Sequence, residues 1–152
     1  MVIDSKAYGK IDVDEKQIFH FDGGLLGFEN IKKFALLDAN QPPFMWLQSV
    51  DVAHLAFIVI DPTIFRKDYD PKLSKIDLLF LELDEMNQGD NQLTLAIVTI
   101  PENQNDMTAN LQGPVILNKE ALLGKQFISE DNRWGTRHHI MEELAGKRSS
   151  KC

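Results

Sequence analysis

Histidines are the residues of this sequence best suited to proton transfer or metal binding, because imidazole titrates near neutral pH and ligates metals. His20 shares a strand-like alternation with Ile18, which predicts a half-buried place in a β-strand. His138 and His139 are adjacent, so on a helix their side chains diverge by about 100 degrees. They cannot share a metal ion as an i, i+4 pair can. We therefore predict no histidine-based catalytic or metal site.

Acidic side chains cluster in two places, and paired carboxylates can perform acid–base catalysis. Residues 82–85 form one cluster, and Glu102 with Asp106 forms the other. Both lie in or beside polar segments, where carboxylates are normally solvated. Ser49 and Thr108 have no neighbouring histidine in the sequence to activate their hydroxyl groups. The prediction is that the protein is not an enzyme.

Cofactor binding is not predicted either. Gly23, Gly24 and Gly27 lack the flanking strand, helix and spacing of a phosphate-binding loop. The single cysteine, Cys152, cannot form an intramolecular disulfide or a cysteine-based metal site. We expect no metal or organic cofactor, and a cytoplasmic location.

The composition suits one globular core. The chain has 152 residues, of which 43% are hydrophobic, and we predict one domain over residues 1–146 followed by a polar tail over residues 147–152. A formal net charge of -7 repels phosphate backbones and favours a basic partner, which predicts a protein partner and no direct nucleic acid. The sequence shows no signal-peptide pattern, and no apolar run approaches the roughly 20 residues that span a bilayer. We therefore expect neither export nor membrane insertion.

The centre of the fold is predicted to be a strand. Residues 93–100 are almost all aliphatic or β-branched, which indicates a strand covered on both faces. Pro101 and the polar residues after it end this strand in a turn. An extended pattern resumes at residues 107–111, and Gly113 with Pro114 interrupts it before it continues. This order predicts a β meander.

Hydrophobic patterns and turn residues predict the remaining elements. Ser74 and Asp77 resemble a capping box, and Leu73, Ile76, Phe80 and Leu83 follow helical spacing, which favours a helix here. Residues 78–83 are also compatible with a strand. The other predicted elements are a hairpin of residues 10–14 and 17–21, a hairpin of residues 44–50 and 55–60, a loop at 87–91, a closing strand at 122–129 and a helix from Thr136 to Ala145 ended by Gly146. Many short strands with one or two short helices predict a mainly β fold, a small antiparallel β-barrel-like single domain, or a sandwich.

Several sequence motifs follow one another in a fixed order. The meander contains Val98-Thr99-Ile100-Pro101-Glu102, then residues 107–111, then Gly113-Pro114-Val115-Ile116-Leu117-Asn118; further motifs stand at residues 21–29, 43–50, 55–62 and 124–126. Together they resemble the FliW family, the bacterial flagellar assembly factors. The resemblance extends over residues 8–140, and the small β-barrel-like fold of that family agrees with the predicted strands. The chain departs from the family pattern at His138-His139, where a His-Pro pair is usual, and at the unusually apolar residues 78–81.

The resemblance implies a cytoplasmic regulator that binds flagellin and also CsrA, a small translational repressor. While bound, CsrA would no longer block flagellin synthesis. Accumulating flagellin would occupy the protein and release CsrA, and export of flagellin would free the protein again. This partner switching requires binding energy but no covalent chemistry. A chaperone-like role toward flagellin is also implied.

A different class of protein, the oligonucleotide-binding β-barrel, would place aromatic residues beside basic ones. Phe44, Trp46 and Phe57 are not interleaved with Lys or Arg, which disfavours that alternative. A gel shift with generic RNA would separate the two classes. The ring of Trp46 is predicted either to join the core or to line a groove for a partner.

The polar turn after the central strand is the other candidate binding surface. It joins the charges of Glu102 and Asp106 to Met107, an apolar side chain that adapts to many partners. Met107, Thr108 and Asn110 would orient a partner there. The alternative is that these side chains only shape the turn, and that Asn110 fixes a loop by bonding the backbone.

Overall fold

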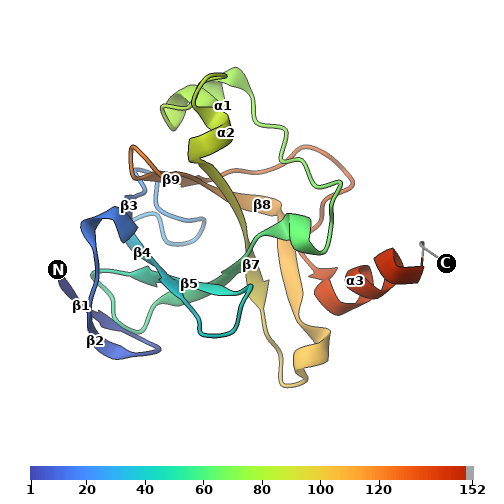
Figure 1. Ribbon diagram of the computed structural model, residues 1–152, viewed down its shortest axis with the longest axis horizontal. Coiled ribbons are helices and arrows are strands. Elements are labelled where there is room, and N and C mark those ends of the chain that lie inside the picture. The colour runs from blue at the N-terminus through green and yellow to red at the C-terminus, as the bar shows by residue number, and fades with distance from the viewer. Residues whose placement is uncertain (150–152) are drawn as a thin grey trace.

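Seven strands close into a barrel in the computed structural model, which describes residues 1–149 and the side chains of residues 1–146 (Figure 1). The barrel strands are β3 (Ile18–His20), β4 (Lys33–Asp38), β5 (Met45–Ser49), β6 (Ala56–Ile60), β7 (Gln92–Thr99), β8 (Thr108–Asn118) and β9 (Leu123–Gln126). The sheet runs in the order β8-β7-β6-β5-β4-β3-β9, and β9 pairs again with β8 to close the ring. Only the β3–β9 pair of this ring is parallel. The predicted mainly β, antiparallel barrel is confirmed.

The other described elements surround this ring. They are β1 (Val2–Ser5), β2 (Gly9–Asp12), β10 (His138–His139), α1 (Lys75–Phe80), α2 (Gln88–Asn91), α3 (Ile140–Ser149) and the short 3-10 turns η1 (Glu15–Gln17), η2 (Pro62–Ile64) and η3 (Gln104–Asp106). Helix α3 includes the first residues of the predicted 147–152 tail. Residues 150–152, with Cys152, lie outside the described part of the chain.

Alternation along the strands gives the barrel an inner and an outer layer of apolar residues. The inner core is built from the fully or almost fully buried residues Phe19, Phe21, Leu25, Phe34, Leu47, Val59, Leu95, Val115 and Leu117. The phenyl rings of Phe21 and Phe34 meet edge to face with centroids 5.2 Å apart. This arrangement is the one that aromatic quadrupoles favour.

Three apolar clusters cover the outside of the barrel. The hairpin cluster lies under β1 and β2 and contains Ile3, Val13, Ile18, Ala35 and Leu37. The α1 cluster contains Leu81, Leu83, Ile116 and Phe127. The Trp134 cluster contains Ile60, Phe65, Tyr69, Ala96, Val98, Ala109, Leu111, Trp134 and Ile140. Because β7 contributes Leu95 to the inner core and Ala96 to the Trp134 cluster, the prediction that this strand is covered on both faces is confirmed.

Strand β8 contains a long irregularity where the sequence predicted an interruption. Leu95 pairs with Val115 and Ile97 pairs with Asn110, so the single residue Ala96 of β7 faces four residues of β8. Gly113 and Pro114 lie in this bulge, and β8 continues through it. A bulge accommodates a proline because its residues leave the regular hydrogen-bond ladder.

The first predicted hairpin is wrong. Strand β2 pairs with β1, which places Ile11 opposite Ile3, whereas β3 enters the barrel beside β4. A capping box separates the two segments: Asp14 accepts the N–H of Lys16 at 2.9 Å, and Gln17 accepts the N–H of Asp14 at 2.9 Å. The hairpin predicted from residues 44–50 and 55–60 is confirmed as β5 and β6.

Helix α1 confirms the predicted capping box and excludes the strand alternative for its residues. The Ser74 hydroxyl accepts the N–H of Asp77 at 3.1 Å, and the Asp77 carboxylate accepts the N–H of Ser74 at 3.0 Å. The apolar residues that follow divide between two environments. Leu81 is buried in the α1 cluster, while Leu79 and Phe80 are exposed. The predicted loop at 87–91 is instead the helical turn α2.

The histidines differ from their predictions. His20 is exposed, not half-buried, because it ends β3 where the chain leaves the barrel. His138 and His139 form β10 and pair with Ala109 and Thr108 of β8. The C-terminal helix therefore begins at Ile140 and not at Thr136, and it continues beyond Gly146. The closing strand is shorter than predicted and ends at Gln126.

Candidate functional site

The acidic turn lies at the tip of the β7–β8 hairpin, which projects from the barrel (Figure 1). The 3-10 turn η3 holds its backbone, and the Asn103 side chain accepts the N–H of Asn105 at 3.1 Å. Glu102 and Asp106 are both exposed. Within residues 1–146 their carboxylates form no hydrogen bond or ion pair. The tip therefore presents two solvated negative charges on an ordered turn.

Met107 and Thr108 join this tip to the body of the protein. Met107 is half-buried and packs against the Trp134 cluster, and its carbonyl accepts the N–H of Ile140 at 3.2 Å. Thr108 lies between two strands, opposite Thr99 of β7 and His139 of β10. Their partly exposed side chains stand directly beside the acidic tip, as the sequence predicted.

Asn110 has the structural role that the alternative interpretation gave it. Its side-chain oxygen accepts the N–H of Gly113 at 2.8 Å inside the β8 bulge. The Gln126 amide donates to the carbonyl of Gly113 at 2.9 Å, and its oxygen accepts the N–H of Leu26 at 2.9 Å. Two side-chain amides thus satisfy backbone groups that the bulge removes from the ladder.

Trp46 does not join the acidic tip. It lies on β5 opposite Leu37 and Ile58, and its half-buried ring packs against the hairpin cluster. Phe44, which directly precedes β5, packs against the Trp134 cluster. The structure therefore favours a packing role for Trp46 beneath β1 and β2.

Trp46→Ala is expected to destabilise the protein by about 2 kcal/mol, less than the loss of a fully buried tryptophan because the ring is only half-buried. Urea unfolding of both proteins measures this difference. Binding of a protein partner should be unchanged for the folded variant. A normal free energy of unfolding with weakened partner binding would instead place Trp46 in a binding groove.

A polar network that the sequence did not indicate supports the base of the hairpin. Glu143 of α3 accepts a hydrogen bond from Arg66 at 2.6 Å and lies 2.9 Å from Nδ1 of His138. Nε2 of His138 accepts the N–H of Gly135 at 2.8 Å, so the ring proton sits on Nδ1 and is donated to Glu143. Asp68 also accepts from Arg66 and thereby raises the pKa of the guanidinium. These partners are up to 77 residues apart, and no local pattern connects them.

Asp131 is the carboxylate whose pKa is lowered by the clearest set of contacts. Hydrogen bonds from the Arg133 guanidinium lower its pKa most, followed by the Arg133 backbone N–H and by Lys72 at 3.3 Å. A carboxyl group with a lowered pKa stabilises the fold above its ordinary pKa of 3.8, and this stabilisation is lost as the pH falls through the lower folded value.

Asp131→Asn should therefore reduce the pH dependence of stability below about pH 4. Urea unfolding at pH 7 and at several values between pH 2 and 4 would measure the slope for both proteins. The wild-type protein should lose more stability on acidification than the variant. Equal slopes would show that Asp131 keeps its ordinary pKa in the folded protein.

Within residues 1–146, no group of three or more His, Cys, Asp or Glu side chains is placed to hold a metal ion. In the same part of the chain, no helix is long and apolar enough to cross a membrane. The hairpin tip presents negative charge beside the partly exposed side chain of Met107.

Comparisons with a family model, with related sequences and with a solved structure agree on one protein family. Residues 2–140 match a family model described as "FliW protein". The chain is 46% identical over 145 residues to the flagellar assembly factor FliW of Leptospira interrogans, with 94% of this chain and 95% of that protein covered. It is 43% identical over 144 residues to the flagellar assembly factor FliW of Treponema denticola, with 95% and 96% covered. A crystal structure of the flagellar assembly factor FliW superposes with a TM-score of 0.83 at 33% identity, over 92% of this chain and 96% of that one.

Proposed function

Because this chain belongs to the FliW family, we propose that it serves flagellar assembly by binding protein partners and not by catalysis. The family resemblance predicted from the sequence is confirmed by the match over residues 2–140. The shared fold extends over nearly all of the chain, so the relatives' role as assembly factors applies to the whole barrel.

The proposed partners are flagellin and the translational repressor CsrA, which the protein binds in turn in the cytoplasm. Binding of CsrA relieves repression of flagellin synthesis, and binding of flagellin releases CsrA. Flagellin held in this way is also shielded before export, which is a chaperone-like effect. The coupling is reciprocal, since each partner must lower the affinity for the other by the same factor.

The observation that supports a partner surface is the acidic tip of the β7–β8 hairpin, whose carboxylates have no partner among residues 1–146. Glu102 and Asp106 stand exposed on a turn that the 3-10 geometry holds in place, beside the adaptable side chain of Met107. Charges at an interface rim increase the association rate with a partner of opposite charge. A basic surface on a partner would meet this tip together with Thr108.

The double variant Glu102→Lys, Asp106→Lys is expected to fold normally, because both side chains are exposed. It should associate with a basic partner about tenfold more slowly at low salt, with a weaker salt dependence. Stopped-flow or surface-based kinetics with purified CsrA and flagellin, at low and moderate salt, would measure both rates.

Asp4→Lys, Asp51→Lys is the matched control. These two side chains are also exposed, and the control changes the net charge by the same amount away from the tip. Equal slowing by both double variants would assign the effect to net charge alone. Wild-type rates for both partners would remove the hairpin tip as a binding surface. Binding of neither partner by the wild-type protein would contradict the proposed function itself.

A further inference from the structure

We propose that a cleft on another side of the barrel binds an extended peptide segment of a partner protein, which adds a strand beside Ile128 and places a basic side chain on Glu130. This proposal goes beyond the function proposed above, since it names a second surface and the chemistry of its ligand.

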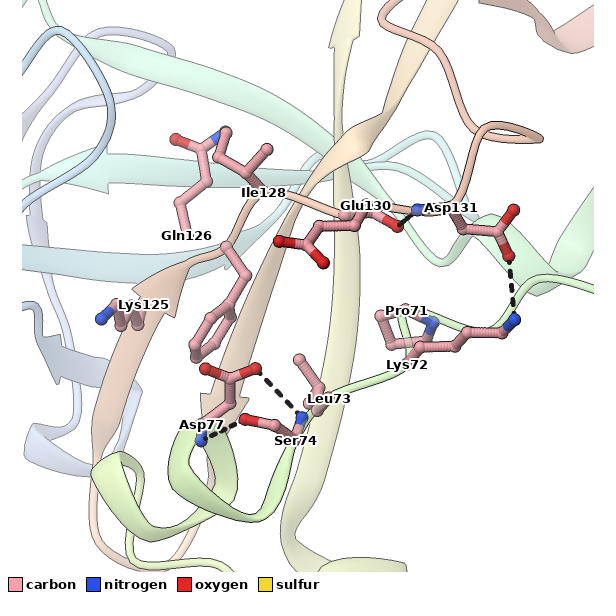
Figure 2. A pocket seen from close by; sticks show the side chains of 12 residues that line it. Pro71, Lys72, Leu73, Ser74, Asp77, Lys125, Gln126, Ile128, Glu130 and Asp131 are labelled. Carbon is pink, nitrogen blue, oxygen red and sulfur yellow. Dashed lines mark hydrogen bonds and ion pairs between the residues drawn. The ribbon is translucent and has the colours of Figure 1, made fainter.

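The cleft lies between the segment that leads into α1 and the segment that follows β9 (Figure 2). Its volume is about 720 Å³, which is within the range of well-formed ligand sites. One wall is formed by residues 71–74 with Asp77, and the other by residues 125–131. At one end Lys72 forms an ion pair with Asp131 at 3.3 Å, and at the other end lies Lys125.

The wall after β9 presents a free strand edge. The N–H of Phe127 donates to Pro114 at 3.0 Å, and the N–H of Ser129 donates to Gln112 at 2.7 Å, so these two residues continue the pairing with β8. Ile128 lies between them, and strand alternation directs its N–H and C=O away from β8. Neither group forms a hydrogen bond within the described residues. An unpaired edge of this kind is a template for an added strand.

The side chains beside this edge define what the added strand should carry. Ile128 is 58% exposed, and Leu73 on the opposite wall is half-buried, so an apolar side chain has a surface to cover. The Glu130 carboxylate points into the space between these two residues (Figure 2). It has no ion pair or hydrogen bond in the part of the chain that the structure describes.

The other charges around the cleft already have partners. Lys72 is paired with Asp131, and Asp77 accepts the N–H of Ser74 in the capping box. Lys125 lies over the ring of Phe80, with Nζ 4.0 Å from the ring centroid. Glu130 is thus the charge that an incoming ligand can neutralise, and a lysine or arginine of the peptide is its complement.

Charge also decides between possible occupants. A second copy of this chain would bring another net charge of -7 to an edge that already carries Glu130, and this opposes self-association. A nucleic acid would meet Glu130 and Asp131 and only two lysines, both engaged. An extended segment with an apolar residue and a basic residue two positions earlier fits an antiparallel pairing, in which both side chains lie on the face of Ile128 and Glu130.

The test uses the acetylated and amidated peptide Thr-Lys-Thr-Val-Thr-Val-Thr as a probe. Its first valine should pair with Ile128 and its lysine with Glu130. Fluorescence anisotropy of the labelled peptide measures affinity, and amide hydrogen exchange by NMR locates the contact. We expect binding to slow exchange of the Ile128 N–H. The same peptide with N-methylvaline at the first valine should bind about tenfold more weakly, because the backbone donor is lost.

A charge swap tests the second half of the proposal. A peptide with glutamate in place of lysine should bind wild-type protein about tenfold more weakly, because one attractive contact becomes repulsive. Glu130→Lys should reverse the preference, so that the glutamate peptide binds more tightly. Asp51→Lys, an exposed charge reversal outside the cleft, should keep the wild-type preference.

Failure of this proposal can be distinguished from failure of the hairpin-tip surface. Glu102→Lys, Asp106→Lys should bind the lysine peptide normally, whatever its effect on CsrA or flagellin. No binding of the peptide, unchanged exchange at Ile128, or equal affinity for the lysine and glutamate peptides would overturn the proposal. Protection of Ile128 that depends on protein concentration without peptide, with a dimer in analytical ultracentrifugation, would assign the edge to a second copy and would also overturn it.

Discussion

Gly24→Ala should destabilise the protein by about 3–5 kcal/mol, the sum of a left-handed backbone strain and a steric overlap. Gly24 has a φ of 62 degrees, in the region that residues with a Cβ atom rarely adopt. A methyl group there would overlap the carbonyl oxygen of Phe28 and lie 2.7 Å from Cα of Glu29. Both are backbone atoms of the same turn, so the overlap cannot be relieved by a side-chain rotation.

Two neighbouring glycines separate these contributions. Gly27 has a φ of 86 degrees, but a Cβ atom there would meet no atom within 4 Å. Gly27→Ala should therefore cost only the backbone strain, about 1–2 kcal/mol. Gly23 has neither a positive φ nor a close neighbour, and Gly23→Ala should change stability by less than about 0.5 kcal/mol. Urea unfolding of the three variants gives the order directly.

The turn at Gly24 also positions contacts of the barrel. Leu25, one residue after Gly24, is buried in the inner core, and the N–H of Leu26 donates to the Gln126 amide at 2.9 Å. A displaced Gly24 would move both contacts. Equal destabilisation by Gly24→Ala and Gly27→Ala would contradict the steric part of the argument.

Local patterns were sufficient to predict those elements whose cause is local. The aliphatic run of β7 and the Ser74–Asp77 capping box each act within a few residues, and both are confirmed. Gly24 and Gly27 adopt positive φ, a local backbone requirement that glycine meets without a Cβ clash. In each case the residues that determine the structure lie within one short sequence window, so a local pattern predicts it.

Pairing partners were less predictable because register is decided by distant residues. Residues 10–12 and 18–20 both have strand-like patterns. In the structure the former (β2) pair with β1, whereas the latter (β3) pair with β4 in the barrel. Buried amides behave similarly. Asn118 donates to the carbonyl of Leu81 at 2.7 Å and thereby connects β8 to the end of α1, 37 residues earlier in the chain. An amide side chain within an apolar segment indicates a buried hydrogen bond, but the sequence does not predict which residue is the partner.

Local sequence also predicted that part of the candidate site whose residues are neighbours along the chain. Glu102, Asp106, Met107 and Thr108 are neighbours in sequence, and the hairpin keeps them together at its tip. Trp46 was a separate candidate, for the core or for a partner groove, and its ring packs against the hairpin cluster. The strand edge at residue 128 depends on hydrogen bonds to the β8 bulge, which no local pattern encodes.

Trp134 is the residue whose role sequence analysis missed most completely, and Trp134→Ala is expected to cost about 3–5 kcal/mol. Its ring is 2% exposed and meets Tyr69 edge to face at 4.8 Å. The guanidinium groups of Arg66 and Arg133 each lie 4.8 Å from the ring centroid. Two cations over one indole add to the apolar burial, since each is attracted by the electron-rich ring.

Trp134→Phe is the matched variant, because it keeps an aromatic ring beside the two guanidinium groups. It loses the indole N–H, which donates to the carbonyl of Asp70 at 3.2 Å, and part of the ring volume. Its expected cost is about 1–2 kcal/mol. Urea unfolding of the two variants compares the free energy of unfolding lost with the whole ring to that lost with the indole N–H and part of the ring volume.

Hydrogen exchange gives the local consequence of the same substitution. The carbonyl of Gly135, next to Trp134, accepts the N–H groups of Leu111 and Gln112 at 3.0 Å each, and so connects this segment to the β8 bulge. Trp134→Ala should therefore accelerate exchange at Leu111 and Gln112 more than at Leu95, which lies in the inner core. Uniform acceleration at all three amides would mean that the ring stabilises only the global fold. Unchanged exchange with a normal free energy of unfolding would show that the Trp134 cluster contributes little to local or global stability.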